Sequence, residues 1–136
     1  MREAVICSPL RTPIGRYGGK LREVDAETLA EVVVQRLLEN TKLDTSVVDD
    51  CIFGQCYPTM ESPAIGRVAA LAAGLPVEVP GFQVDRRCGS GLLAICIAAM
   101  QVQTGVADVV IAGGVESMGT ADFYATSVRW GPNRGV

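Results

Sequence analysis

A predicted helix that is apolar on almost every side constrains the fold of this 136-residue chain more than any other segment. The helix runs from Cys88 to about Thr104, and Gly105 ends it. Apolar residues cover nearly its full circumference: Leu92, Leu93, Ala94, Ile95, Ile97, Ala98, Ala99, Met100 and Val102. A helix that is apolar all round is buried in the middle of a protein. We therefore expect it to lie between layers, in a structure larger than one sheet layer can cover.

Strand-like and helix-like segments alternate along the rest of the chain. Strands are expected at 4–7, 51–54, 82–84 and 109–112, and helices at 25–40, 64–73 and 88–104. Asp25 can cap the first of these helices, and Gly74 and Pro76 stop the second. The run 109–112 is continuously apolar, as in strands buried on both faces. This alternation predicts an α/β fold with a mainly parallel sheet.

The composition excludes several classes of protein. The chain is 49% hydrophobic and 20% charged, which is typical of a compact globular domain rather than a disordered segment. A net charge of −3 provides no basic surface for nucleic acid. No apolar run reaches the roughly 18 residues of a membrane span, and the first residues lack the pattern of a signal peptide. We expect a cytoplasmic protein that contacts neither nucleic acid nor membrane.

The cysteines do not form a metal or disulfide pattern. There are five, irregularly spaced (Cys7, Cys51, Cys56, Cys88 and Cys96), and the chain has no histidine. With no Cys-x-x-Cys pair either, neither a zinc cluster nor a thioredoxin-like motif is predicted. Most of these cysteines are expected to be small buried hydrophobic residues.

Cys88 is the exception, because it stands where a strand ends and a helix begins. At a helix N-terminus a thiol meets unpaired backbone N–H groups and the positive end of the helix dipole, which favour the thiolate. The small residues that follow it let a substrate carbonyl approach the backbone closely. This geometry suits a nucleophile that carries an acyl group. The alternative is a buried structural cysteine, and the usual histidine base has to come from elsewhere.

Three other segments carry residue types that occur in functional sites. The run Gly15-Arg16-Tyr17-Gly18-Gly19-Lys20 does not have the spacing of a phosphate-binding P-loop, and it is expected to be an ordered surface loop. The run Ala112-Gly113-Gly114-Val115-Glu116-Ser117 follows a buried strand, where α/β folds place ligands. Its glycines either line a site or only permit close packing. Asp49 and Asp50 are expected to be solvated or capping rather than catalytic.

Four motifs, in order along the chain, resemble those of the thiolases, the family of acetyl-CoA acetyltransferases and 3-ketoacyl-CoA thiolases. The active-cysteine segment is matched by Asp85-Arg86-Arg87-Cys88-Gly89-Ser90-Gly91-Leu92. The other three are Arg11-Thr12-Pro13-Ile14-Gly15 with Gly18-Gly19, Pro63-Ala64 to Arg67 with Ala72-Ala73-Gly74-Leu75-Pro76, and Gly113-Gly114-Val115-Glu116-Ser117-Met118. The resemblance spans essentially the whole chain.

The resemblance implies acyl transfer through a thioester on Cys88. Cys88 would take an acyl group from acyl-CoA and pass it on, either in Claisen condensation or in thiolytic cleavage of a 3-ketoacyl-CoA. Its backbone N–H would be half of an oxyanion hole. The residues expected to line the site are Gly89, Ser90, Gly113, Gly114, Glu116, Ser117 and Met118. Coenzyme A and acyl-CoA are expected as substrates in fatty acid metabolism, with no permanently bound cofactor and no metal.

The resemblance also implies how the chain is organised. The fold would be the N-terminal thiolase domain, with a five-stranded, mostly parallel sheet and helices on both faces. This domain would occupy residues 1–119, and 120–136 would begin the loop domain that binds CoA. The family's histidine and second cysteine belong to a C-terminal half, and Cys96, inside a helix, does not replace that cysteine. The intact enzyme would be a homodimer or homotetramer, and the 136 residues alone would be inactive.

One position departs from the family pattern, and two other functions stay open. Asp85 stands where thiolases commonly have Asn, and a carboxylate facing Cys88 would oppose the thiolate unless Arg86 and Arg87 offset it. The chain could instead be a subunit that is active only with a complementary chain carrying the histidine. It could also be a non-catalytic module that binds acyl-CoA.

Overall fold

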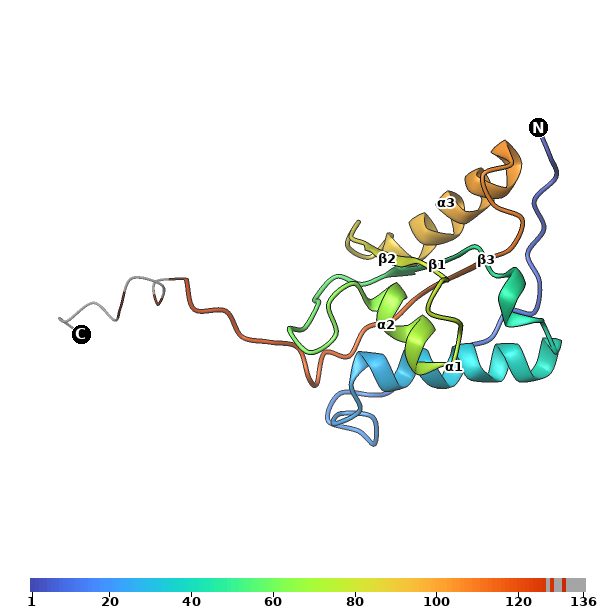
Figure 1. Cartoon of the computed structure of the whole chain (residues 1–136). Helices are drawn as coiled ribbons and strands as arrows, with labels where there is room; N and C mark the ends of the chain where they lie inside the picture. Colours follow the sequence, from blue (N-terminus) through green and yellow to red (C-terminus); the bar gives the residue numbers. More distant parts are fainter. Residues whose placement is uncertain (127, 129–130, 132–136) are drawn as a thin grey trace.

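The sheet has three parallel strands in the order β2-β1-β3 (Figure 1). The computed structural model describes the chain except for residues 127, 129–130 and 132–136. The strands are β1 (Asp50–Gly54), β2 (Gly81–Val84) and β3 (Val110–Gly114). Gly54 pairs with Val84 on one side and with Gly114 on the other, so the carboxyl ends of all three strands meet at one edge. The predicted strands 51–54, 82–84 and 109–112 are confirmed within one residue or two.

Helices cover both faces of the sheet, as the sequence predicted. Helices α1 (Ala26–Thr41) and α2 (Ile65–Ala72) lie on one face, and α3 (Ser90–Thr104) lies on the other (Figure 1). A short 3-10 turn, η1 (Thr45–Val47), leads into β1. The predicted cap of α1 is confirmed, because the Asp25 carboxylate accepts the Thr28 N–H at 2.6 Å. The described chain is therefore a three-layer α/β structure.

Glycines bring the start of α3 close to the ends of the central strands. A Cβ on Gly54 would lie 2.3 Å from the carbonyl carbon of Ser90, and a Cβ on Gly114 would lie 3.0 Å from the Cα of Gly91. Only residues without a side chain allow this approach. The first turn of α3, and with it Cys88, is thereby held at the carboxyl edge of the sheet.

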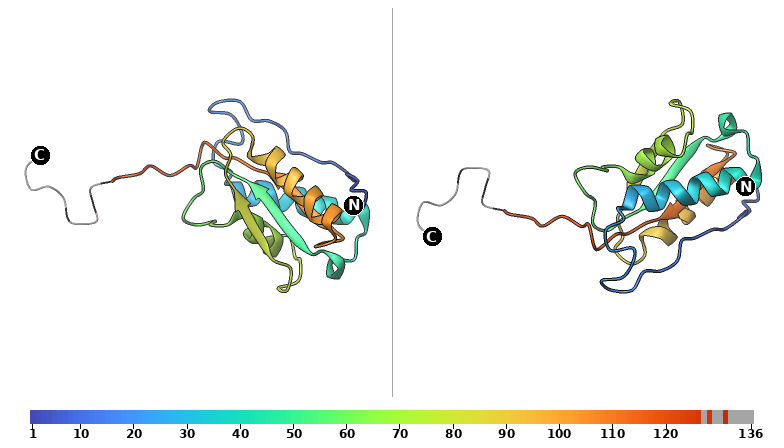
Figure 2. Two further views of the ribbon diagram at one scale, coloured as in Figure 1. Left: turned by 90° about the horizontal axis from the view of Figure 1, so that it is seen from above. Right: turned by 90° about the horizontal axis from the view of Figure 1, so that it is seen from below.

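The predicted first strand at 4–7 is wrong for the described chain. This segment has no strand assignment and is largely exposed. It follows the outside of the domain near α3, where the Arg2 N–H donates to the Gln103 carbonyl at 3.1 Å (Figure 2). A strand needs a neighbouring strand to satisfy its backbone groups, and here the apolar pattern alone did not provide one.

Two other sequence expectations need correction or remain open. The helix expected to start at Cys88 begins at Ser90, with Gly89 as its N-cap, because residues 86–89 form a turn instead. The described residues contain three of the five expected strands. The expected start of a loop domain at 120–136 lies partly outside the described residues.

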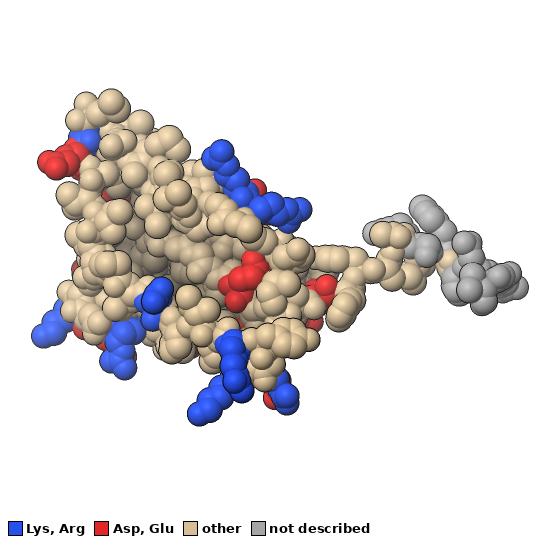
Figure 3. Space-filling view, turned by 180° about the vertical axis from the view of Figure 1, so that it is seen from behind, with Lys and Arg blue, Asp and Glu red and all other residues tan. Residues whose placement is uncertain are grey.

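Helix α3 is only half covered. Ala94 and Ala98 are buried against Ile52 of the sheet, whereas Leu92 is 68% and Met100 is 52% exposed. On the face of the molecule seen in Figure 3, the charged side chains lie mostly around the rim and the middle carries few of them. Among the described residues, no helix is long and apolar enough to cross a membrane.

Candidate functional site

Cys88 lies in the turn between β2 and α3, at the carboxyl edge of the sheet. Its side chain is exposed, and it is the residue immediately before the N-cap of α3. The N–H groups of Gly89 and Ser90 are engaged in the turn, with the carbonyls of Arg86 and Arg87. The N–H of Cys88 donates to no acceptor among the described residues. The turn thus presents a thiol and a free backbone donor side by side.

Arg87, the residue before Cys88, holds an uncommon backbone conformation. Its φ of 51° lies in the left-handed region, which costs a non-glycine residue free energy. The Asp85 carboxylate accepts the Arg87 backbone N–H at 2.9 Å and its guanidinium at 3.0 Å. Asp85, which stands where thiolases commonly have Asn, therefore has a structural role: its carboxylate accepts hydrogen bonds from Arg87.

Ser90 ties the same turn together from inside. Its side chain is buried, at 3% exposure. The hydroxyl accepts the Arg86 N–H at 2.7 Å and donates to the Arg87 carbonyl at 2.6 Å. Because both hydrogen bonds go to the backbone of the turn, the Ser90 hydroxyl stabilises the turn that precedes and includes Cys88.

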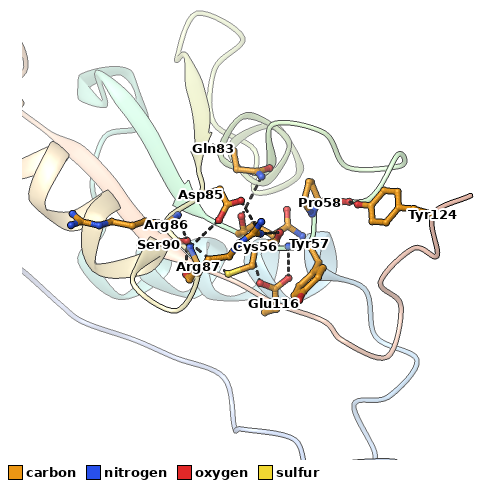
Figure 4. Close-up of polar contacts among 11 residues, drawn as sticks. Cys56, Tyr57, Pro58, Gln83, Asp85, Arg86, Arg87, Ser90, Glu116 and Tyr124 are labelled. Carbon is orange, nitrogen blue, oxygen red and sulfur yellow. Dashed lines mark hydrogen bonds and ion pairs between the residues drawn. The ribbon is translucent and has the colours of Figure 1, made fainter. Parts of the chain in front are cut away.

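Glu116 links two loops at the carboxyl edge (Figure 4). It follows β3, and its carboxylate accepts the Cys56 N–H at 2.8 Å and the Tyr57 N–H at 3.2 Å, both in the loop after β1. Hydrogen bonds to a carboxylate are stronger than those between neutral groups. Glu116 therefore fixes the backbone of the loop after β1.

Cys56 contacts the Cys88 turn, and sequence analysis missed it. Its carbonyl accepts the Arg87 guanidinium at 3.3 Å, and its thiol lies 3.9 Å from the Ser90 hydroxyl (Figure 4). Desolvation is the largest cause that raises the pKa of the Cys56 thiol; the Ser90 contact lowers it, and the Glu116 and Asp85 carboxylates raise it. The position of Cys56 directly after a parallel strand was the signal that could have found it.

The remaining predicted site residues have packing or backbone partners, or are exposed. The Ser117 hydroxyl donates to the Val24 carbonyl at 2.5 Å, and Gly113 packs against the Phe53 ring. Met118 is exposed. Gly113 and Gly114 thus permit close packing, which was one of the two roles considered for them. The structure brings together Cys88, Gly89 and Ser90 and connects Glu116 to them through Cys56.

The other cysteines do not share one environment. Cys51 is buried, and desolvation, followed by the nearby Asp50 charge, raises the pKa of its thiol to about 12. Cys7 and Cys96 are exposed, so the expectation that most cysteines are buried is wrong for the described chain. Cys7 lies outside the sheet, and Cys96 lies on the uncovered side of α3. No cluster of three or more potential metal ligands occurs among the described residues.

The fold and the turn define an α/β domain with an exposed cysteine between a parallel strand and a helix. A family profile described as "Thiolase, N-terminal domain" matches residues 4–135. The chain therefore belongs to the thiolase family, as its motifs indicated.

Curated relatives and solved structures agree with this assignment. The chain is 48% identical over 125 residues to the 3-oxoadipyl-CoA/3-oxo-5,6-dehydrosuberyl-CoA thiolase of Escherichia coli, covering 90% of this chain and 31% of the relative. It is 38% identical over 135 residues to an acetyl-CoA acetyltransferase of Pseudomonas aeruginosa, covering 99% and 34%. The crystal structure of the Bacillus anthracis acetyl-CoA acetyltransferase superimposes with a TM-score of 0.87 at 41% identity, covering 91% and 32%. The chain spans about a third of the length of these proteins.

Proposed function

We propose that this chain supplies the nucleophile of a thiolase-type acyltransferase, with Cys88 as the residue that carries the acyl group. The observation that supports this most is the exposed Cys88 thiol beside its own free backbone N–H, at the carboxyl edge of a parallel sheet. Ligands bind at this edge in open α/β folds. The relatives' names, which include acetyl-CoA acetyltransferase and thiolase, point to the same chemistry.

The proposed reaction has two half-reactions. The Cys88 thiolate attacks the carbonyl carbon of an acyl-CoA, the new C–S bond forms, and the CoA thiolate leaves with its electron pair. The Cys88 N–H stabilises the oxyanion that forms on the carbonyl oxygen in between. In condensation, the acyl group then passes to the carbanion of a second acyl-CoA, and the Cys88 thiolate leaves. In thiolysis, the Cys88 thiolate instead attacks the 3-keto carbon of a 3-ketoacyl-CoA, the C2–C3 bond breaks, and its electron pair leaves on the shorter acyl-CoA as a carbanion that is then protonated. The CoA thiolate then takes the acyl group from Cys88. Coenzyme A and acyl-CoA are thus substrates, and the proposal needs no resident cofactor.

The chain needs a second set of residues for turnover. Its 136 residues contain no histidine to take the proton from Cys88. We propose that a C-terminal thiolase half, in the same or a separate chain, provides this base and a second acid. That half would pack on the uncovered side of α3. A division at residue 119, two further strands in the sheet, a homodimer or homotetramer, a cytoplasmic location and a place in fatty acid metabolism stay predictions from the sequence.

The test is thiolysis of acetoacetyl-CoA in the presence of CoA. The purified chain alone is expected to show no turnover, and co-expression with a thiolase C-terminal half is expected to restore it. Cys88→Ser in the co-expressed pair is expected to abolish turnover, because a serine hydroxyl is a far poorer nucleophile without a matched base. Cys7→Ser, which removes another exposed thiol in a segment outside the sheet, is the matched control and is expected to keep turnover. Full activity of Cys88→Ser would rule out the proposed role.

A further inference from the structure

We propose that Glu116 is a positioning residue for Cys88: its carboxylate fixes the Cys56–Tyr57 backbone, and Cys56 in turn holds the turn that presents the Cys88 thiol. The inference rests on the proposed function only for what the thiol does, because the contacts themselves are independent of any reaction. Among the described residues, Glu116 makes no hydrogen bond or ion pair with Cys88, and it would act through Cys56, Arg87 and Ser90.

The first link in this chain of contacts joins two neighbouring strands. Cys56 and Tyr57 follow β1, and Glu116 follows β3, its partner in the sheet. The two loops leave the same edge, and the two carboxylate oxygens each accept one backbone N–H, at 2.8 and 3.2 Å. A carboxylate that accepts two adjacent amides fixes both the position and the orientation of that peptide. A glutamine at this position is neutral and has one carbonyl oxygen and one NH2 group. It would therefore place a donor where one of the two acceptor oxygens of Glu116 lies.

The second link joins this peptide to the Cys88 turn. The Cys56 carbonyl accepts the Arg87 guanidinium at 3.3 Å, and the Cys56 thiol lies 3.9 Å from the hydroxyl of buried Ser90. Figure 4 shows Cys56 between the Glu116 carboxylate and the turn residues. The carbonyl and the thiol of one residue therefore contact the turn at two points, and Glu116 determines where that residue lies.

The turn needs such support because Arg87 is in the left-handed region, at a φ of 51°. A non-glycine residue keeps this conformation only when its surroundings hold it there. Asp85 and Ser90 hold the turn from within, and Cys56 is its contact from the loop after β1. If the loop moves, Arg87 loses one of the two acceptors of its guanidinium. The orientation of the next residue, Cys88, then becomes less fixed.

The experiment compares Glu116→Gln with Glu61→Gln, which removes an exposed carboxylate from the same loop. Amide exchange measured by NMR on the 136-residue chain reports each link. In Glu116→Gln, the Cys56 and Tyr57 amides are expected to exchange roughly ten- to a hundredfold faster, since bonds to a charged acceptor are lost. The Gly89 and Ser90 amides of the turn are expected to exchange severalfold faster. The Val34 amide in the buried middle of α1 reports the general stability and is expected to stay unchanged. Glu61→Gln is expected to change none of these exchange rates.

A second variant, Glu116→Asp, keeps the charge but is one methylene shorter, so it is expected to give the same pattern at smaller amplitude. It replaces Glu116→Gln as the test if fast exchange of the Val34 amide shows that Glu116→Gln has lost its fold. Faster exchange at Cys56 and Tyr57 with unchanged Gly89 and Ser90 would overturn the inference, because Glu116 would then act on its own loop alone.

Iodoacetamide labelling of the same samples measures the thiols. The Cys88 rate is expected to fall severalfold relative to Cys96 in Glu116→Gln. The Cys56 rate is expected to rise, because the Glu116 charge that raises its pKa is gone. An unchanged ratio of Cys88 to Cys96 would contradict the positioning role. The proposed base for Cys88 lies outside the 136 residues, so the thiolysis assay tests the proposed nucleophile, and the exchange data decide separately whether Glu116 holds the turn.

Discussion

The two faces of the sheet differ in how completely they are covered. Against α1 and α2, the buried core includes Ala26, Ala30 and Val34 of one helix and Ile65 and Ala69 of the other. Against α3, three residues are buried, Ile52, Ala94 and Ala98, and the large side chains Leu92 and Met100 point away from the sheet. The first face is covered by two helices and forms the larger buried core. The second is a smaller contact, in which two alanines of the helix meet the sheet, with an apolar helix surface on its outer side.

This difference shows what the apolar pattern of α3 encodes. Ala94 and Ala98 face the sheet and let the helix lie close to it, whereas Leu92 and Met100 lie on the outer side. A helix with one such face needs only one neighbouring layer, and a helix with two needs a second. The sequence of α3 is therefore that of a helix between two layers, one of which is present in the described chain.

The largest change in the free energy of unfolding is expected on the face that α1 and α2 cover. Ile65→Ala is expected to lower the free energy of unfolding by about 2–5 kcal/mol, because Ile65 is fully buried and its removal leaves a cavity. Urea unfolding followed by circular dichroism measures the change. Leu71→Ala, on the exposed side of the same helix, is the control and is expected to cost much less. Equal losses in the two variants would mean that α2 is not closely packed.

An intermediate effect is expected where α3 meets the strand ends. Gly54→Ala is expected to cost about 1–3 kcal/mol, because its Cβ would meet the backbone of Ser90, which cannot yield. Gly91→Ala is the matched control: its Cβ would lie 3.7 Å from the Gly114 Cα, and alanine favours a helix over glycine by about 1 kcal/mol. We expect Gly91→Ala to be neutral or stabilising in the same unfolding experiment. A neutral Gly54→Ala would show that α3 is held less closely than described.

The smallest effect is expected on the outer side of α3. Leu92→Ala is expected to change the free energy of unfolding by no more than about 0.5 kcal/mol, because Leu92 is largely exposed. A loss comparable with that of Ile65→Ala would remove the distinction between the two faces, since it would place Leu92 in a core. If a C-terminal half is then added, the same variant is expected to become destabilising.

Local patterns predicted most of the fold. The Asp25 cap, the Gly74 and Gly105 stops and the apolar runs of β1, β2 and β3 each act over a few residues, and these predictions are confirmed. The strand at 4–7 was not, because forming a strand depends on a partner that the local pattern does not specify. The start of α3 shifted by two residues because Asp85 and Ser90 bond to a turn that competes with the helix.

The site was predicted less completely than the fold. Cys88 and Glu116 came from motifs, but the contacts between them did not, since Glu116 reaches Cys56 across 60 residues of sequence. Cys56 is part of no motif that was recognised. Its role follows only from the parallel pairing of β1 with β3, which brings both loops to one edge.

That pairing also has a consequence for how the chain folds. Both ladders of the sheet are parallel, and β3 joins β1 across about 60 residues. Closing a loop of this length costs chain entropy before any contact in the ladder forms, so topologies of this kind fold slowly. During synthesis, β1 has to wait until α3 and β3 have been made before the sheet is complete. Until then one side of the central strand exposes unpaired backbone groups that other chains can bind.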